Sequence, residues 1–221
     1  MKTPQAQPRP LFVLSLLLFS STFLHPILAV HYASAPTPST QTAPTNGSEF
    51  IRTSCNATLY PDICYSSLAG YSTSVQQNPA RLATAAITLT LSKVKRVAVY
   101  VSNLSRQADF GADPRAAAAL HDCFSNFGDA VDEIYGSLKQ MRQLGSAVHS
   151  GSKVSFRFQM SNVQTWMSAA LTDEETCTDG FEDVPEGQLK TDVCNRATYV
   201  KKLTSNALAL VNSYAEKEMN L

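Results

Sequence analysis

The strongest constraint on the fold is the spacing of apolar residues in four long segments, where they recur every three or four positions. This spacing places the apolar side chains on one face of a helix, so each segment must bury a stripe. Asn78-Pro79 and Asp113-Pro114 open the first two segments with a capping side chain followed by proline, a typical helix start. The stripes run over residues 87–101, 120–141, 160–181 and 193–214.

Short links containing Gly, Pro or Asp separate these segments. Helices joined by short links pack as antiparallel neighbours, so the sequence predicts an all-α, antiparallel up-down-up-down four-helix bundle. Residues 48–74, which include Tyr60-Pro61, are expected to form a helical hairpin ahead of the bundle. The patch Val97, Val99 and Val101 alternates like a strand, but the helical period continues through it, so we expect a helix there too.

The N-terminus has the zones of a secretory signal peptide. Basic residues precede an apolar run at 11–24, and Ala33, Ala35 or Ala29 offer small-residue cleavage positions. The apolar run is shorter than a membrane-spanning helix requires, so we do not expect it to anchor the protein. We predict that residues 1–35 are removed and that the protein is secreted without membrane attachment. The Pro/Thr/Ser-rich residues 36–47 are expected to be a tail, followed by the helical domain at 48–221.

Removal of this leader changes the net charge only slightly. The chain has 18 basic and 18 acidic residues, and the leader holds two basic and no acidic ones, so the mature chain carries 16 − 18 = −2. This total gives no reason to expect nucleic acid or an anionic membrane as a partner. The secretory route makes three Asn-X-Ser/Thr sequons candidate glycosylation sites, at Asn46, Asn56 and Asn103.

Five cysteines, in a protein expected to be exported, are typical of structural disulfides. Cys55 and Cys64 enclose eight residues within the expected hairpin. Cys123 and Cys177 fall on the second and third apolar stripes, so a bond between them would clamp those helices together. Cys194 lies beside the fourth stripe and is predicted to be a free, partly buried thiol.

The sequence offers little catalytic chemistry. His121 and His149, the two histidines of the mature chain, are too far apart for a zinc or haem site, and no nucleophile or phosphate-binding motif is present. We therefore expect no metal, no cofactor and no enzymatic activity. Carboxylates crowd the end of the third helix and one side of the second; their polar helix positions favour a solvated or partner-binding face over acid–base catalysis. They are Asp173, Glu174, Glu175, Asp179, Glu182, Asp183, Glu186 and Asp192, with Asp122, Asp129, Asp132 and Glu133.

Four segments together resemble the plant invertase and pectin methylesterase inhibitor family. They read FIRTSCNATLYPDICYSSL, AAAALHDCFSNFGDAVDEIYGSL, VQTWMSAALTDEETCTDGF and LTSNALALVN, and the resemblance covers nearly all of residues 48–218. It implies a four-helix bundle with an N-terminal helical hairpin and the disulfides Cys55–Cys64 and Cys123–Cys177. It also implies an inhibitor that acts in the apoplast or cell wall.

The resemblance further implies a target. TWMSAALT with TCTDGF is closer to the pectin methylesterase inhibitors, and the Pro-Lys-Phe type of motif common in invertase inhibitors is absent. The expected partner is thus a pectin methylesterase, bound by the monomer in a 1:1 complex over the substrate cleft. Carried over by position, the partner-binding residues are Asp129, Asp132, Thr176 and Asp179, whereas Ser125 replaces an acidic residue. Inhibition of acid invertase, or a non-inhibitory role as a wall interaction protein, are the alternatives.

Overall fold

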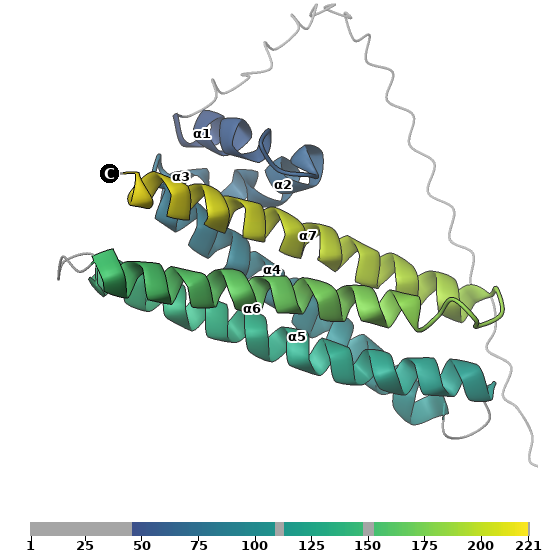
Figure 1. The fold of residues 1–221 in the computed structure, drawn as a ribbon. Coiled ribbons are helices and arrows are strands. Elements are labelled where there is room, and N and C mark those ends of the chain that lie inside the picture. The colour runs from purple at the N-terminus through teal and green to yellow at the C-terminus, as the bar shows by residue number, and fades with distance from the viewer. Residues whose placement is uncertain (1–45, 109–112, 148–152, 221) are drawn as a thin grey trace, which may run out of the picture. The chain divides into compact units, whose positions relative to one another are not determined.

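A computed structural model describes residues 46–108, 113–147 and 153–220, so the expected leader and His149 lie outside it. Four long helices carry most of the chain: α4 (Pro79–Ala108), α5 (Pro114–Ala147), α6 (Lys153–Asp179) and α7 (Gln188–Met219). They lie side by side in Figure 1, each packed against the next, and α7 closes the arrangement against α4. The segments between them are too short to lead back along helices of 27 to 34 residues, so we infer that successive helices alternate in direction.

Side-chain caps start the first two long helices where the sequence predicts them. The Asn78 side-chain oxygen accepts a hydrogen bond from the main-chain nitrogen of Arg81 at 2.9 Å. Asp113 accepts in the same way from the nitrogens of Arg115 at 2.9 Å and Ala116 at 3.2 Å. Each cap satisfies main-chain donors that have no partner within the helix, while the following proline needs no donor.

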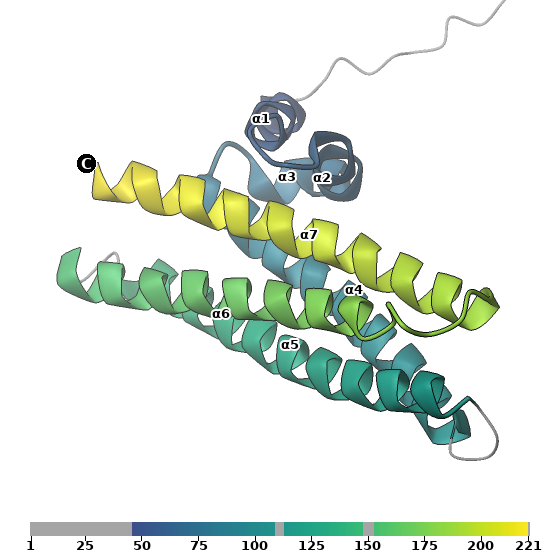
Figure 2. The same ribbon diagram turned by 45° about the vertical axis from the view of Figure 1, so that its right-hand side comes forward.

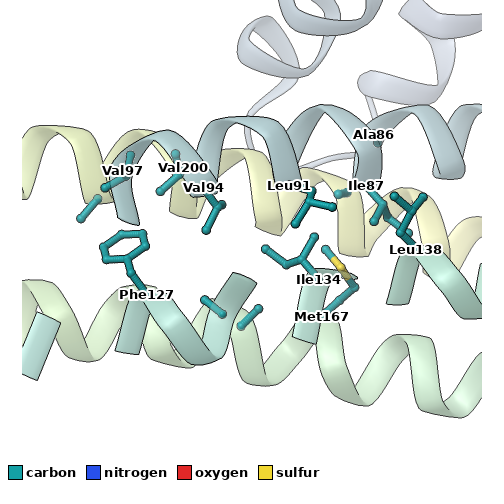
Figure 3. Packing of buried hydrophobic residues seen from close by; sticks show 14 of the residues in the cluster. Ala86, Ile87, Leu91, Val94, Val97, Phe127, Ile134, Leu138, Met167 and Val200 are labelled. Atoms are coloured by element: carbon teal, nitrogen blue, oxygen red, sulfur yellow. The ribbon is translucent and has the colours of Figure 1, made fainter. Parts of the chain in front are cut away.

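The predicted apolar stripes meet in one core (Figure 3). Leu91 from α4, Ile134 from α5, Met167 from α6 and Val200 from α7 are all buried there. The stripe on α4 differs from the expected one in one turn, because Val97 is buried whereas Ala98 is half-buried.

The third apolar stripe continues beyond the end of its helix. α6 ends at Asp179, yet Phe181 beyond it is 0 % exposed. The chain turns there through hydrogen bonds from the nitrogens of Phe181 to the oxygen of Thr178, at 3.1 Å, and of Glu182 to that of Asp179, at 3.0 Å. This turn lets a residue outside the helix complete the core.

The N-terminal hairpin consists of α1 (Asn46–Cys55) and α2 (Pro61–Leu68), followed by a 3-10 turn (Ala69–Tyr71) and α3 (Ser72–Val75). These short elements pack against α4 and α7, on the side away from α5 and α6 in both ribbon views (Figures 1 and 2). The outer surface of the α5–α6 pair therefore stays uncovered.

The helical part begins at Asn46, before the boundary at residue 48 that the sequence suggests. Gly47 is buried in α1, and a Cβ atom at this position would lie 2.3 Å from the main-chain oxygen of Ser72. Only glycine therefore allows α1 to approach α3 this closely, and this approach ties the start of α1 to the body.

Asn206 of α7 fastens the hairpin to the bundle. Its Oδ1 accepts a hydrogen bond from the main-chain nitrogen of Tyr60 at 3.1 Å, and its Nδ2 donates to the oxygen of the same residue at 3.0 Å. Asn206 is 3 % exposed. Without it the Tyr60 nitrogen would lack a partner, whereas the Tyr60 oxygen would keep the hydrogen bond that it accepts from the nitrogen of Cys64 at 2.9 Å. The Lys202 ammonium also lies 5.4 Å from the centre of the Tyr60 ring.

Replacing Asn206 with alanine is expected to lower the free energy of unfolding by about 2 kcal/mol, because the part-buried nitrogen of Tyr60 loses its partner and the oxygen of Tyr60 loses one of its two hydrogen bonds. The hairpin should also become more accessible to protease around residues 56–60. Urea unfolding and limited proteolysis measure the two effects. Asn195→Ala, an exposed change on the same helix, serves as the control; equal stability of the two variants would contradict the role of Asn206.

Candidate functional site

Two contacts hold α5 and α6 together. The Cys123–Cys177 disulfide joins the two helices with their Cα atoms 4.2 Å apart. Farther along, Gly136 lies under the ring of Trp166, whose Cε3 would be 3.2 Å from a Cβ at that position. A glycine in α5 therefore allows the indole to lie close against the helix. A covalent bond and a close aromatic contact thus fix how these two helices face each other.

A group of three carboxylates lies between these two fixed points. Glu133 of α5 and Asp173 of α6 are both half-buried, and a hydrogen bond joins their carboxyl groups. Burial, then the contact with Asp173 and the charge of Asp129, raise the pKa of Glu133 to about 7. Burial also raises the pKa of Asp173, helped by the charge of Asp129, although its bond to Glu133 acts in the opposite direction. The pair therefore holds a proton well above the pH at which free carboxylates lose theirs.

The four residues expected to bind a partner are all exposed. Asp129 belongs to the carboxylate group just described, and Asp132 lies on the same helix nearby. Thr176 precedes the disulfide cysteine of α6, and Asp179 ends that helix. The structure therefore brings Asp129 together with Glu133 and Asp173, residues that the family resemblance does not single out. Thr176 and Asp179 lie farther along α6, on either side of Cys177.

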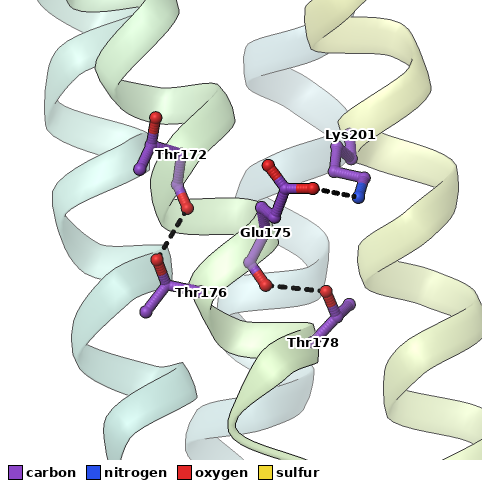
Figure 4. Close-up of polar contacts among 5 residues, drawn as sticks. All are labelled: Thr172, Glu175, Thr176, Thr178 and Lys201. Atoms are coloured by element: carbon purple, nitrogen blue, oxygen red, sulfur yellow. Dashed lines mark hydrogen bonds and ion pairs between the residues drawn. The ribbon is translucent and has the colours of Figure 1, made fainter.

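Hydroxyl groups continue this surface along α6 (Figure 4). The Thr176 hydroxyl, on the side of α6 toward α5, donates to the main-chain oxygen of Thr172 at 2.8 Å. The Thr178 hydroxyl, on the side toward Glu175 and α7, donates to the main-chain oxygen of Glu175 at 2.7 Å. Each hydroxyl oxygen keeps its capacity to accept a hydrogen bond from outside. On the neighbouring side of α6, the Glu175 carboxylate pairs with Lys201 of α7 at 3.1 Å. Carboxylate and hydroxyl oxygens together make this a surface of acceptors.

Glu174 lies inside the bundle, away from the surface carboxylates. It is 0 % exposed, its Oε1 accepts a hydrogen bond from the Thr204 hydroxyl at 2.8 Å, and its Oε2 has no partner among the described residues. Burial raises its pKa to about 8; the bond from Thr204 and the charge of Lys201 act against this shift, and the charge of Asp173 adds to it. The period of the third stripe passes through position 174, so spacing alone could have identified this residue as buried.

The cysteines are arranged as the resemblance implies. Disulfides join Cys55 to Cys64 and Cys123 to Cys177, and Cys194 is a free, half-buried thiol. The side chains of the three predicted glycosylation sites are exposed: Asn46 at the start of α1, Asn56 in the turn after it and Asn103 on α4. Glycosylation at these positions stays a prediction.

Metal binding and membrane insertion were the other possibilities for the described residues. Within the described ranges, no three His, Cys, Asp or Glu side chains gather closely enough to hold a metal ion. His121 is exposed, and its Nδ1 lies 2.8 Å from the Ser105 hydroxyl on α4. None of the helices that the structure describes combines the length and the apolar character needed to cross a membrane.

Comparison with known proteins agrees with this architecture. The profile described as plant invertase/pectin methylesterase inhibitor matches residues 49–210. A "21 kDa protein" of Daucus carota is 39 % identical over 201 residues, which cover 90 % of this chain and 97 % of that protein. Pectinesterase inhibitor 11 of Arabidopsis thaliana is 39 % identical over 190 residues, or 86 % of this chain and 92 % of that one.

A solved structure shares the fold. The crystal structure of mutant form A of a pectin methylesterase inhibitor from Arabidopsis superposes with a TM-score of 0.56 at 21 % identity, covering 73 % of this chain and 95 % of that chain. The sequence profile spans most of the helical part described above, including both disulfides. The chain therefore belongs to the plant invertase/pectin methylesterase inhibitor family.

Proposed function

We propose that this protein is a secreted inhibitor of a pectin methylesterase, which it binds one-to-one over the substrate cleft with the outer surface of α5 and α6. The family description covers inhibitors of two enzymes. Relatives named pectinesterase inhibitors, among them inhibitors 11 and 3 of Arabidopsis thaliana at 39 % identity, support the esterase as the target. The expected leader supports a place of action outside the cell, in the apoplast or cell wall.

The observation that carries this proposal is the group of exposed hydrogen-bond acceptors, carboxylate and hydroxyl oxygens, on the disulfide-linked pair α5 and α6. Asp129, Asp132 and Thr176 are exposed on two helices that a disulfide holds together. A rigid surface loses little conformational freedom when it binds, so more of its contact energy appears as affinity. Carboxylates on such a surface complement a partner that presents Arg, Lys or N–H donors.

The double substitution Asp129→Asn/Asp132→Asn is expected to weaken inhibition of a pectin methylesterase by about tenfold or more, because each charge pair lost at an interface costs about 1 kcal/mol or more. Inhibition constants measured with a purified esterase test this. Both residues are exposed, so the helix content should not change.

A control variant distinguishes loss of charge on the proposed binding surface from a change in the total charge of the protein. Glu49→Gln/Glu216→Gln removes two exposed carboxylates outside α5 and α6 and changes the net charge equally. This control should inhibit like the unsubstituted protein. Equal inhibition by the Asp129/Asp132 variant would show that the binding surface lies elsewhere.

A parallel assay against an acid invertase decides between the two enzymes that the family description names. We expect inhibition of the esterase and none of the invertase. Inhibition of the invertase alone would replace the proposed target, and inhibition of neither enzyme would favour a non-inhibitory interaction protein.

A further inference from the structure

Charge is distributed very unevenly among the long helices. α4 carries five basic residues and no acidic one: Arg81, Lys93, Lys95, Arg96 and Arg106. The acidic residues of the bundle lie instead on α5, α6, α7 and the segment after α6. The chain as a whole is nearly neutral, but every charged residue of α4 is basic.

The cations on α4 are not neutralised within the described part of the chain. Arg81 donates to the Gln76 side chain at 2.9 Å, Arg106 donates to the side chains of Ser102 and Asn103, and the Lys95 ammonium lies 5.7 Å from the centre of the Tyr135 ring. None of these partners is a carboxylate. The ion pairs seen in the described residues, Lys190–Glu186 and Lys201–Glu175, lie elsewhere.

Four of the five cations share one face of α4. At 3.6 residues per turn, Arg81, Lys95, Arg96 and Arg106 fall within an arc of about 100°. All four side chains are exposed, whereas Val94 on the opposite arc is fully buried. The row from Arg81 to Arg106 extends over about 37 Å of helix at 1.5 Å per residue. This geometry suits a long, linear anion better than a small one.

A hollow lies at the start of this row. It has a volume of about 410 Å³, and its lining includes the guanidinium-bearing side chains Arg81 of α4 and Arg142 of α5 together with Tyr71, Thr84 and Thr88. None of the described residues that line it carries a carboxylate. Guanidinium groups bind carboxylates, hydroxyls pair with sugar hydroxyls, and an aromatic ring can pack on the flat face of a sugar.

We propose that the cationic face of α4, with the hollow at its start, binds a linear polycarboxylate: the de-esterified stretches of pectin, whose sugars each carry a carboxylate. Hydrolysis of a pectin methyl ester leaves this group, so the choice of polymer rests on the proposed function. The cationic face lies on α4, and the hollow at its start also includes Arg142, near the C-terminal end of α5 and ten positions after Asp132. The protein therefore holds the product polymer on α4 while the part of α5 and α6 around Asp129, Asp132 and Thr176 contacts the enzyme.

Binding of the full mature chain to immobilised polygalacturonate, in the absence of any esterase, tests the proposal. The protein is deglycosylated first, because the predicted site Asn103 lies on the same helix. We expect binding at about 0.05 M salt that is largely lost at about 0.5 M, since salt screens exposed charges. Highly methyl-esterified pectin, which lacks the carboxylates, should bind weakly or not at all.

Substitution of the cations on α4 tests whether this face is the one that binds the polymer. Lys95→Gln/Arg96→Gln/Arg106→Gln should weaken binding to polygalacturonate by about tenfold or more, because each cation near a dense anionic surface adds to the affinity. Arg115→Gln/Lys153→Gln/Arg157→Gln removes three exposed cations from α5 and α6 and is the matched control. Equal losses in both variants, or no binding by the unsubstituted chain, would overturn the proposal. So would binding to dextran sulfate or nucleic acid without binding to polygalacturonate.

Esterase inhibition is measured on the same variants, so that the two proposals can fail separately. The α4 variant should inhibit a pectin methylesterase as the unsubstituted protein does. A loss of polymer binding with inhibition retained supports two separate surfaces. A loss of both with an unchanged helix content would mean that α4 belongs to the enzyme-binding surface, which contradicts the inference.

Discussion

Replacing Glu174 with glutamine is expected to make the protein more stable at pH 8 and to flatten the dependence of its stability on pH. The pKa of Glu174 is about 8 in the folded protein, against an ordinary value of 4.5. Between these values the unfolded chain has released this proton and the folded chain still holds it. The free energy of unfolding of the unsubstituted protein should therefore fall as pH rises from about 4.5 to about 8, by about 1.4 kcal/mol per pH unit.

Glutamine at this position is neutral at every pH, so this part of the pH dependence disappears. Its side-chain oxygen can still accept the hydrogen bond from Thr204. We expect the variant to be less stable than the unsubstituted protein at pH 5, because its amide donors gain no partner, and more stable at pH 8 by about 2 kcal/mol. Urea unfolding at both pH values measures the difference.

The control is Glu175→Gln on the adjacent position. Glu175 is exposed and pairs with Lys201, so its loss should leave the pH dependence of stability nearly unchanged. Glu133, with a pKa of about 7, adds a smaller dependence of the same sign that both variants keep. An unchanged pH dependence in Glu174→Gln would show that the buried carboxyl does not hold its proton.

Removing the Cys123–Cys177 disulfide is expected to destabilise the protein strongly. The bond closes a loop with a sequence separation of 54. The chain-entropy model assigns about 4 kcal/mol to a loop of this length. Cys123→Ala/Cys177→Ala should thus lower the free energy of unfolding by about that amount. Because the same bond fixes the two helices that carry Asp129 and Thr176, the variant should also inhibit the esterase less well.

Two cysteine variants provide comparisons. The Cys55–Cys64 disulfide closes a loop with a separation of only 9, so its removal should cost about 2.5 kcal/mol and leave inhibition largely intact. Cys194→Ala removes a half-buried thiol that has no covalent partner and should cost less than either. Denaturant unfolding ranks the three. A loss from Cys123→Ala/Cys177→Ala no larger than that from the short loop would contradict the clamping role of the long one.

Local sequence patterns predict much of this fold, because helix caps and apolar stripes depend on residues that lie close together in the sequence. Asn78 and Asp113 start their helices as expected, and the helix α4 continues unbroken through Val97, Val99 and Val101. The partner of each cysteine follows from the family resemblance, and the structure confirms both disulfides.

Features that depend on contacts between distant segments are not visible in the sequence. Glu133 and Asp173 meet only because α5 and α6 face each other in one particular register. The attachment of Tyr60 to Asn206 joins residues 146 positions apart. Glu174 is a different case: its spacing indicates burial, but its charge argues against it, and only the structure shows that Thr204 meets it inside the bundle.

The net charge also gives no information about how the charged residues are distributed among the helices. Without the expected leader the chain would carry −2, from 16 basic and 18 acidic residues, and this total argues against an anionic partner when the chain is treated as a whole. The separation of charge between α4 and the α5–α6 pair becomes evident only when charges are counted by helix and placed on exposed faces.

The protonation of Cys194 has a consequence for the durability of the covalent framework. Burial raises the pKa of this thiol, aided by Glu186 and opposed by Lys190. Exchange between sulfur atoms requires a thiolate as the attacking group, so a thiol that stays protonated is a poor nucleophile. Cys194 is therefore expected to be a slow initiator of disulfide exchange, so that both bridges would keep their pairing even where the surroundings are oxidising.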